Sequence, residues 1–343
     1  MRRLPLRQRT AKICLAYAQV STATPQPIDY PQRIINAEIV PCIKGGLALA
    51  GCLLLAACPG VAAEQGVEFH YTMRGEVRLL LFWIGRDKVG GGHVGIRRGS
   101  NPDLKERWKE VEVVFGSNPD RVPGRISRWG YGVERAVWTL GSDDKLSRSV
   151  FEGLIRYSPE ESLSEVRAAA RRGDSRVYQA TQSAVEREKA WVNQYLFDEQ
   201  EDFDYRHPEK LVAKFHGEIR RRAPDQKAEL KNQPSVYREP QGFLTALDGL
   251  CRQIAALPRP TRGPLPSETY VYQARLYRLA VQGLQNLGSS VRAEFEAVNL
   301  QKGTRTSFTL TLPTTGERRG VPSQIVFAPR WWLRLRLDLV EVR

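Results

Sequence analysis

The chain has 343 residues, of which 41% are hydrophobic, and its formal net charge is +14. This length and composition are typical of a globular protein with one large domain or two ordinary ones, and they exclude a disordered or a collagen-like chain. Residues 1–63 hold seven of the 52 basic residues and two of the 38 acidic ones, which leaves 45 basic and 36 acidic residues in the remainder. Because those basic residues are scattered along the sequence, we expect no nucleic-acid partner.

An apolar segment follows Lys44 and predicts a signal peptide at residues 40–63. Pro59 ends the apolar segment, and the small residues after it fit cleavage by signal peptidase after Ala63. The segment is shorter than the roughly 20 residues that a membrane-spanning helix needs. We therefore expect an exported protein, located in the periplasm or secreted.

A second interpretation of the same segment is a lipid anchor. Residues 55–58 resemble a bacterial lipobox, in which Cys58 would carry the lipid and hold the protein in the cell envelope. Such an anchor would be the only contact with a membrane. Residues 1–39 precede the signal and are interpreted as a non-structural leader or the result of a mis-assigned start. Only Cys251 lies beyond residue 63, which excludes an internal disulfide and a cysteine metal cluster in the folded part.

Residues 64–157 form a predicted N-terminal β-rich region. The apolar stretches Val67–Met73 and Val77–Ile84 predict a hairpin that turns at Arg74 and Gly75. The glycine-rich stretch after it predicts a turn between strands. The sequence Gly-Ser-Asn-Pro-Asp occurs twice, and each copy predicts a turn. The further strands expected in this region are His93–Arg97 and Glu110–Phe115.

Residues 158–343 are predicted to form a helix plus a C-terminal antiparallel sheet. A capping box predicts a helix over Ser158–Gly173, and an apolar stripe predicts a second one over Phe243–Leu257. Residues 176–197 predict two strands, and Pro258–Pro266 predicts an extended connector. The strands expected after it are Tyr270–Val281, Val291–Val298, Ser307–Leu312, Gln324–Phe327 and Trp331–Val342.

The closing strand indicates the kind of sheet. Its leucines at 333, 335, 337 and 339 alternate with Arg334, Arg336 and Asp338, as in an antiparallel strand with one buried and one solvated face. We therefore predict a mainly β (α+β) fold. Its architecture is a long antiparallel curved sheet or open barrel-like meander with two packed helices, and residues 64–343 can form one domain.

The glycine-rich stretch also matches a phosphate-binding motif. Gly90, Gly92 and Gly95 have the spacing G-x-G-x-x-G, but residues 96–102 cannot begin the helix that a dinucleotide site needs. The other motifs of a protein kinase are missing from the sequence. We therefore interpret these glycines as structural and expect no cofactor.

Two clusters of polar residues are candidate sites. Asp87, His93 and Arg97 surround the glycines, and a neutral histidine beside an aspartate can act as a general base. The alternative is a charged hairpin end. The second cluster is an acidic loop with Asp198, Glu199, Glu201, Asp202, Asp204 and His207. It lacks the glycine and the ligand order of a calcium-binding loop. His216 has no partner at the spacing of a zinc site, so we expect no metal.

Three stretches carry a resemblance to exported bacterial proteins. They read FWIGRDKVGGG at residues 82–92, ISRWGY at 126–131 and VPSQIVFAPRWWLRLRLDL at 321–339. In these stretches the chain resembles uncharacterised exported β-rich bacterial proteins of unknown function, and the resemblance spans about residues 66–343. It implies no catalytic residues. A curved sheet with helices on its concave side is also similar to envelope lipoprotein carriers, as a likeness of fold alone.

These observations lead to two hypotheses of function. The first is an exported, non-enzymatic cell-envelope protein that binds an apolar or amphipathic ligand, such as a lipid or another envelope component, or a partner surface. The alternative is a secreted hydrolase that uses acidic residues, either Asp202 and Asp204 or Asp87 with His93. A hydrophobic cavity would favour the carrier, and carboxylates facing each other across a cleft would favour the enzyme.

Overall fold

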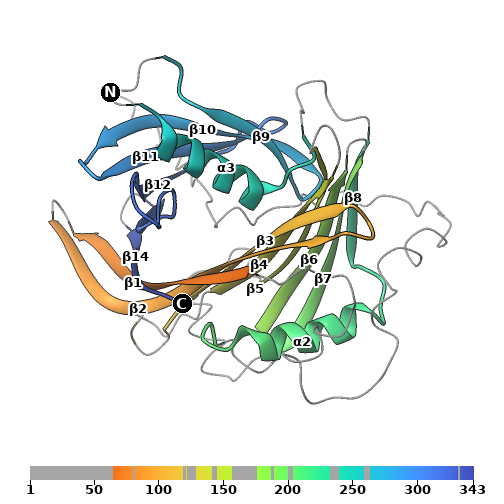
Figure 1. Ribbon diagram of the computed structural model, residues 1–343. Helices are drawn as coiled ribbons and strands as arrows, with labels where there is room; N and C mark the ends of the chain where they lie inside the picture. Colours follow the sequence, from red (N-terminus) through yellow and green to blue (C-terminus); the bar gives the residue numbers. More distant parts are fainter. Residues whose placement is uncertain are drawn as a thin grey trace, which may run out of the picture.

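The computed structural model describes residues 65–79, 82–118, 121, 129–140, 145–156, 176–186, 189–199, 204–231, 239–258, 263–330 and 333–343. Within them, fourteen strands form one antiparallel sheet that does not close into a barrel, and two helices pack against it (Figure 1). The predicted mainly β fold is confirmed. The helix expected at 158–173, Ala63 and Cys58 lie outside the described residues.

The sheet consists of two meanders that are joined where β1 pairs with β14. Within each meander, every strand pairs with its neighbours in sequence. The sheet is continuous across residues 157 and 158, because β5 pairs with β6. The first meander comprises β1 (Gln65–Leu79), β2 (Phe82–Asn101), β3 (Glu106–Ser117), β4 (Trp129–Thr139), β5 (Leu146–Arg156), β6 (Arg176–Glu186), β7 (Lys189–Glu199) and β8 (Gln226–Lys231).

The second meander follows the prediction except at its start. The stretch Tyr270–Val281 was expected to be one strand, but it contains a hairpin whose turn residues Gln273 and Ala274 have positive φ angles of 48° and 52°. Two such residues are typical of a type I′ turn, and neither is the glycine or asparagine that would reveal it in a sequence. The strands are β9 (Ser267–Tyr272), β10 (Arg275–Asn286), β11 (Ser290–Asn299), β12 (Arg305–Pro313), β13 (Gln324–Arg330) and β14 (Leu333–Val342).

The first hairpin also differs from the prediction. β1 continues through Arg74 and Gly75, and its pairing with β2 shifts register between Met73 and Gly75. The strand is bulged there rather than turned. The glycine-rich stretch is likewise no turn, because it forms the middle of β2 and pairs with both β1 and β3. The predicted strand His93–Arg97 is the second half of the same long strand.

Side chains alternate between two faces of the sheet. We call the face that packs against α3 (Phe243–Ala256) the inner face, and the opposite one the outer face (Figure 1). On β1, Phe69, Tyr71 and Met73 are buried on the inner face, where they form a cluster with Leu337 of β14. The predicted inward leucine face of the closing strand is thus confirmed.

Helix α3 lies between the two meanders. Leu250 and Ile254 of the predicted apolar stripe are fully buried, and Cys251 beside them is a buried free thiol. They form a cluster with inward side chains from β9 to β12 and with Phe151 of β5. The helix therefore fills the concave side of the curved sheet, opposite to the face that carries α2.

A buried carboxylate attaches the start of α3 to the first meander. Glu134 of β4 is only 1% exposed, and it accepts hydrogen bonds from the backbone N–H groups of Leu244 and Thr245, both at 2.9 Å. Gly242 precedes the helix, and a Cβ at this position would collide with the carboxylate. Burial raises the pKa of Glu134, while the hydrogen bonds from Thr245 and Leu244 act in the opposite direction. Glu134 therefore serves as a helix cap from a distant strand.

A second polar contact joins α3 to β3. Lys109 is buried, and its Nζ lies 2.5 Å from a carboxylate oxygen of Asp248, which Arg252 also contacts. Burial, with smaller effects from Arg252 and Arg98, lowers the pKa of Lys109 to about 6. The inner face thus combines a large apolar cluster with two buried ionisable groups that both lie against α3.

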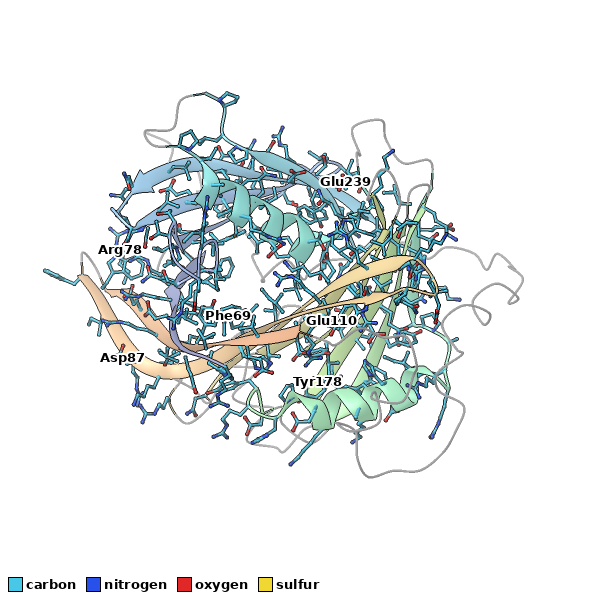
Figure 2. The ribbon with its side chains drawn as sticks, in the orientation of Figure 1. Phe69, Arg78, Asp87, Glu110, Tyr178 and Glu239 are labelled. Carbon is cyan, nitrogen blue, oxygen red and sulfur yellow. The ribbon has the colours of Figure 1, made fainter. Side chains whose placement is uncertain are left out.

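Helix α2 (Pro208–Ile219) packs on the outer face of the first meander (Figure 1). The ring centroid of Phe215 lies 4.5 Å from that of Phe197 and 5.7 Å from that of Tyr178. Tyr178 is fully buried on the side of α2 (Figure 2). The sequence analysis placed no helix here and treated residues 198–207 as an acidic loop. Pro208 in the first turn and the apolar spacing of Leu211, Val212, Phe215 and Ile219 are the signals that could have found it.

Candidate functional site

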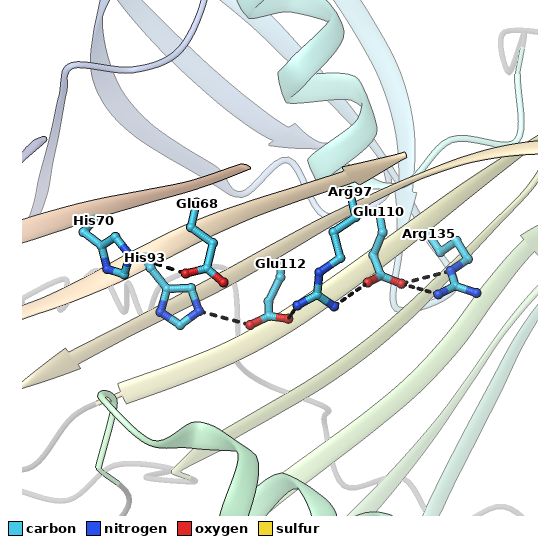
Figure 3. A network of polar contacts seen from close by, with 7 residues as sticks. All are labelled: Glu68, His70, His93, Arg97, Glu110, Glu112 and Arg135. Carbon is cyan, nitrogen blue, oxygen red and sulfur yellow. Dashed lines mark hydrogen bonds and ion pairs between the residues drawn. The ribbon is translucent and has the colours of Figure 1, made fainter. Parts of the chain in front are cut away.

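A polar network runs across the outer face of four neighbouring strands (Figure 3). His93 Nε2 lies 3.0 Å from Glu112 Oε1, and Arg97 Nη2 lies 3.9 Å from Glu112 Oε2. Arg97 also donates to Glu110 at 3.4 Å, and Arg135 donates to the second oxygen of Glu110 at 2.6 and 2.9 Å. The network thus continues from β2 through β3 to β4.

The antiparallel register explains why these side chains meet. Arg97 stands directly opposite Glu110, which stands opposite Arg135 on the next strand. Directly opposed residues on one face of a sheet lie close enough for opposite charges to pair. His70 of β1 is opposed to His93 in the same way, and their ring centroids are 5.9 Å apart.

The predicted trio of Asp87, His93 and Arg97 is only partly brought together. His93 and Arg97 share Glu112, whereas Asp87 is 72% exposed and lies 3.4 Å from Arg74. Six residues of strand separate Asp87 from His93, or about 20 Å at the usual rise per residue. Figure 2 shows Asp87 of β2 far from Glu110 of β3. The carboxylate beside His93 is therefore Glu112, which the sequence analysis did not single out.

The network forms one wall of a cleft of about 500 Å³ between the sheet and α2. Its opposite wall, on α2, combines the apolar Pro208, Val212 and Ala213 with the charged Glu209. His216 of α2 also lines the cleft, and its Nε2 lies 3.0 Å from Glu152 Oε2 of β5. The ionisable residues that line the cleft, apart from Tyr131, are Glu68, His70, His93, Arg97, Glu112, Arg206, Glu209, His216 and Arg343.

The electrostatics of the cleft follow from burial and from these contacts. Burial alone would raise the pKa of Glu152, but hydrogen bonds from His216 and Gln182 and the positive charge of His216 outweigh it, so the pKa is lowered. Tyr131 also lines the cleft, and its pKa is raised by burial and by the nearby carboxylates of Glu112 and Glu152. Glu152 is therefore held in its charged form, and Tyr131 in its neutral form.

The glycines of β2 have a role in positioning α2. A Cβ at Gly91 would lie 3.3 Å from the ring of Tyr205, and a Cβ at Gly116 on the neighbouring strand would lie 2.5 Å from Tyr205 Cβ. Tyr205, just before α2 begins, thus packs against a part of the sheet where these glycines leave the backbone without side chains. Gly90, Gly92 and Gly95 are absent from the described residues with positive φ, so the predicted turn conformation is wrong. The predicted close approach is found at Gly90 and Gly92, whose Cβ atoms would collide with the backbone of β3.

The acidic loop is described only in part. The side chains of Asp198, Glu199, Glu201 and Asp202 lie outside the described residues. Asp204 accepts two hydrogen bonds from Arg206 at 2.7 and 2.8 Å, and this contact lowers its pKa. His207 Nδ1 lies 3.6 Å from Glu209. In the described part of the chain, no three histidine, cysteine, aspartate or glutamate side chains are grouped so that they could hold a metal ion.

The cleft contains a histidine that is positioned by a carboxylate. His93, oriented by Glu112, could accept a proton. However, the described residues that line the cleft include no serine, threonine or cysteine that could act as a nucleophile. Cys251 is buried beside α3, where burial raises its pKa to about 12, so it is held as an unreactive thiol.

A comparison of the sequence with protein-family models, with curated proteins and with solved structures finds no match. Among the helices that the structure describes, none is long and apolar enough to cross a membrane. The interpretation of the cleft therefore depends on its own geometry.

Proposed function

We propose that this protein is an exported, non-enzymatic binding protein of the bacterial cell envelope, and that the cleft between α2 and the outer face of the sheet binds an amphipathic ligand. The observation that supports the proposal is the difference between the two walls of the cleft. The wall of β1–β3 offers mainly charged and imidazole side chains, and the wall of α2 adds the apolar Pro208, Val212 and Ala213 beside Glu209 and His216. A ligand with a charged head and an apolar body matches both walls.

The charges on the sheet wall support binding at a modest cost. Glu112 and Glu110 are already paired with His93, Arg97 and Arg135, so the wall is organised before a ligand arrives. Preorganised polar groups lose little conformational freedom when a ligand binds. Export is supported by the sequence of residues 40–63, with cleavage after Ala63 or lipid attachment at Cys58.

Binding can be tested by calorimetric titration of the mature protein with dodecylphosphocholine below its micelle concentration. This probe has a zwitterionic head and a single apolar chain, and we expect one saturable site. Ala213→Trp should abolish binding, because the indole would fill the cleft from the α2 wall. Lys210→Trp is the matched control, since Lys210 is exposed on the same helix but does not line the cleft. Unchanged binding by Ala213→Trp would refute the assignment of the site.

Export can be tested independently. The full-length chain, expressed in a bacterial host, should appear in the envelope or periplasmic fraction, and the intact mass should show loss of residues 1–63 or a lipid on Cys58. A full-length cytoplasmic product would contradict the proposed location without affecting the proposed ligand site.

A further inference from the structure

All four histidines of the chain gather on one side of the molecule. They are His70, His93, His207 and His216. Three of them line the cleft, and His207 lies just before α2, outside the cleft lining. Histidine is the side chain that ordinarily changes its charge between pH 5 and 8. These four residues come from three segments of the chain and lie in or beside one cleft.

Each histidine has a glutamate close to one of its ring nitrogens. The distances are 3.0 Å for His93 and Glu112 and 3.0 Å for His216 and Glu152. They are 3.4 Å for His70 and Glu68 and 3.6 Å for His207 and Glu209. The His70 nitrogen is buried at that distance without forming a hydrogen bond, so it is not oriented by its neighbour as His93 is. A nearby carboxylate favours the protonated form of an imidazole.

The surrounding charges determine what protonation does to the cleft. The permanent cations near the histidines are Arg97, Arg206 and Arg343 in the lining, with Arg220 near Glu152 and Arg135 beyond Glu110. The carboxylates that face them are Glu68, Glu112 and Glu209 in the lining, Glu152 beside His216, Glu110 beside Arg97 and Glu341 near His70.

The lining of the cleft therefore changes from neutral to cationic as pH falls. Three lining arginines balance three lining glutamates while the histidines are neutral. Protonation of His70, His93 and His216 would add up to three positive charges to this lining.

We propose that the cleft preferentially binds an amphiphile with an anionic head, and that its affinity rises as His70, His93 and His216 become protonated. The inference rests on the proposed function and adds to it the charge of the ligand and the conditions of binding. The apolar side chains of α2 would hold the body of the ligand at any pH, and the histidines of the sheet together with His216 of α2 would hold the head more tightly at low pH. Release would follow a rise in pH.

The test uses octanesulfonate, whose charge is the same at every pH of the experiment, in calorimetric titrations at about pH 5.5 and about pH 8. We expect its affinity to be about tenfold higher at the lower pH, and to weaken with added salt. Octyltrimethylammonium, a cation with the same apolar chain, should show the opposite trend. Methanesulfonate, which lacks the chain, should bind far more weakly, and this separates an amphiphile site from a site for a free anion.

Histidine variants identify the groups responsible. The double variant His70→Gln/His93→Gln should lose most of the tenfold pH effect on octanesulfonate affinity, measured as the ratio of its own affinities at the two pH values. His207→Gln is the matched control, since its side chain is 62% exposed outside the cleft lining, and it should retain the full effect. Melting curves of both variants would establish that they are folded.

Two outcomes separate this inference from the proposed function. Equal octanesulfonate affinity at both pH values, with dodecylphosphocholine still bound, would overturn the inference and leave the amphiphile site intact. Failure of every probe with an apolar chain at both pH values would refute the proposed function itself.

Discussion

The two helices pack on opposite faces of the same sheet in different ways. Helix α3 is enclosed between the two meanders, with Leu250 and Ile254 fully buried and its first turn capped by Glu134. Helix α2 covers one end of the outer face with Phe215, while a cleft remains between its other side and the charged residues of β1–β3. The difference shows that the inner face is closely packed around its helix, whereas the outer face keeps an open, charged cleft beside its helix.

The largest effect should follow removal of the carboxylate that holds α3. Glu134→Ala would remove the helix cap and leave the N–H groups of Leu244 and Thr245 without their acceptor, which costs about 1–3 kcal/mol for each group. We expect a loss of about 3–5 kcal/mol in the free energy of unfolding, measured in urea. Glu112→Ala on the outer face is the control and should cost no more than about 1 kcal/mol. Equal losses would remove the distinction between the two faces.

The closing strand β14 allows the same comparison of the inner and the outer face, because its successive residues lie on opposite faces. Leu337→Ala should lower the free energy of unfolding by about 2–4 kcal/mol, because Leu337 is buried in the inner cluster with Phe69 and Tyr71. Arg334 lies on the other face, with contacts to Glu76 and Trp83 and a partly exposed side chain. Arg334→Ala should therefore cost less than about 1 kcal/mol. Similar costs in chemical denaturation would mean that β14 is buried on both faces.

Glycine substitutions in β2 test how closely each face is packed. A Cβ at Gly92 would collide with the Val114 carbonyl oxygen, whereas a Cβ at Gly95 would have ordinary contact, 3.5 Å from Glu112 Cβ. Gly92→Ala should lower the free energy of unfolding by about 1–3 kcal/mol, and Gly95→Ala should change it by less than about 0.5 kcal/mol. Thermal melts of the two variants measure the difference, and an equal decrease in both would contradict it.

The last comparison concerns the dependence of stability on pH. Since burial lowers the pKa of Lys109 from its ordinary 10.5 to about 6, the unfolded chain binds more protons than the folded one between these values. The contribution of Lys109 therefore makes stability rise with pH across this range. Lys109→Met should flatten that rise, and an exposed control, Lys227→Met, should leave it unchanged. An identical slope in urea titrations of the Lys109 variant and the wild type would show that Lys109 is not protonated on unfolding.

The sequence predicted the parts of the fold that have a simple period. The leucines of β14 and the apolar stripe of α3 are regular enough to identify both elements. The strands β4 and β5 were not predicted, because Gly130, Gly132 and inward polar residues such as Glu134 and Ser149 interrupt their alternation. The turn at Gln273 and Ala274 was missed because neither residue is typical of its positive φ angles.

Less of the candidate site could be predicted. His93 and Arg97 were identified as candidates, but their partner Glu112 depends on the register between β2 and β3, which a single sequence does not determine. The contact of His216 with Glu152 joins residues 64 positions apart, and it exists only because α2 packs on the outer face. The site residues are far apart in sequence and become neighbours through the order of the strands in the sheet. A single sequence does not determine that order.

The pairing of β1 with β14 has a consequence for how the chain folds. The bonds between Glu68 and Arg343, in both directions at 2.9 Å, continue this pairing to the end of the strands. The two meanders can form early from local hairpins, but they become one sheet only after β14 has been synthesised. Pairings of such long range are slow to form. Until then, β1 keeps one edge unpaired and open to pairing with another strand, and β14 is the strand that covers this edge in the folded protein.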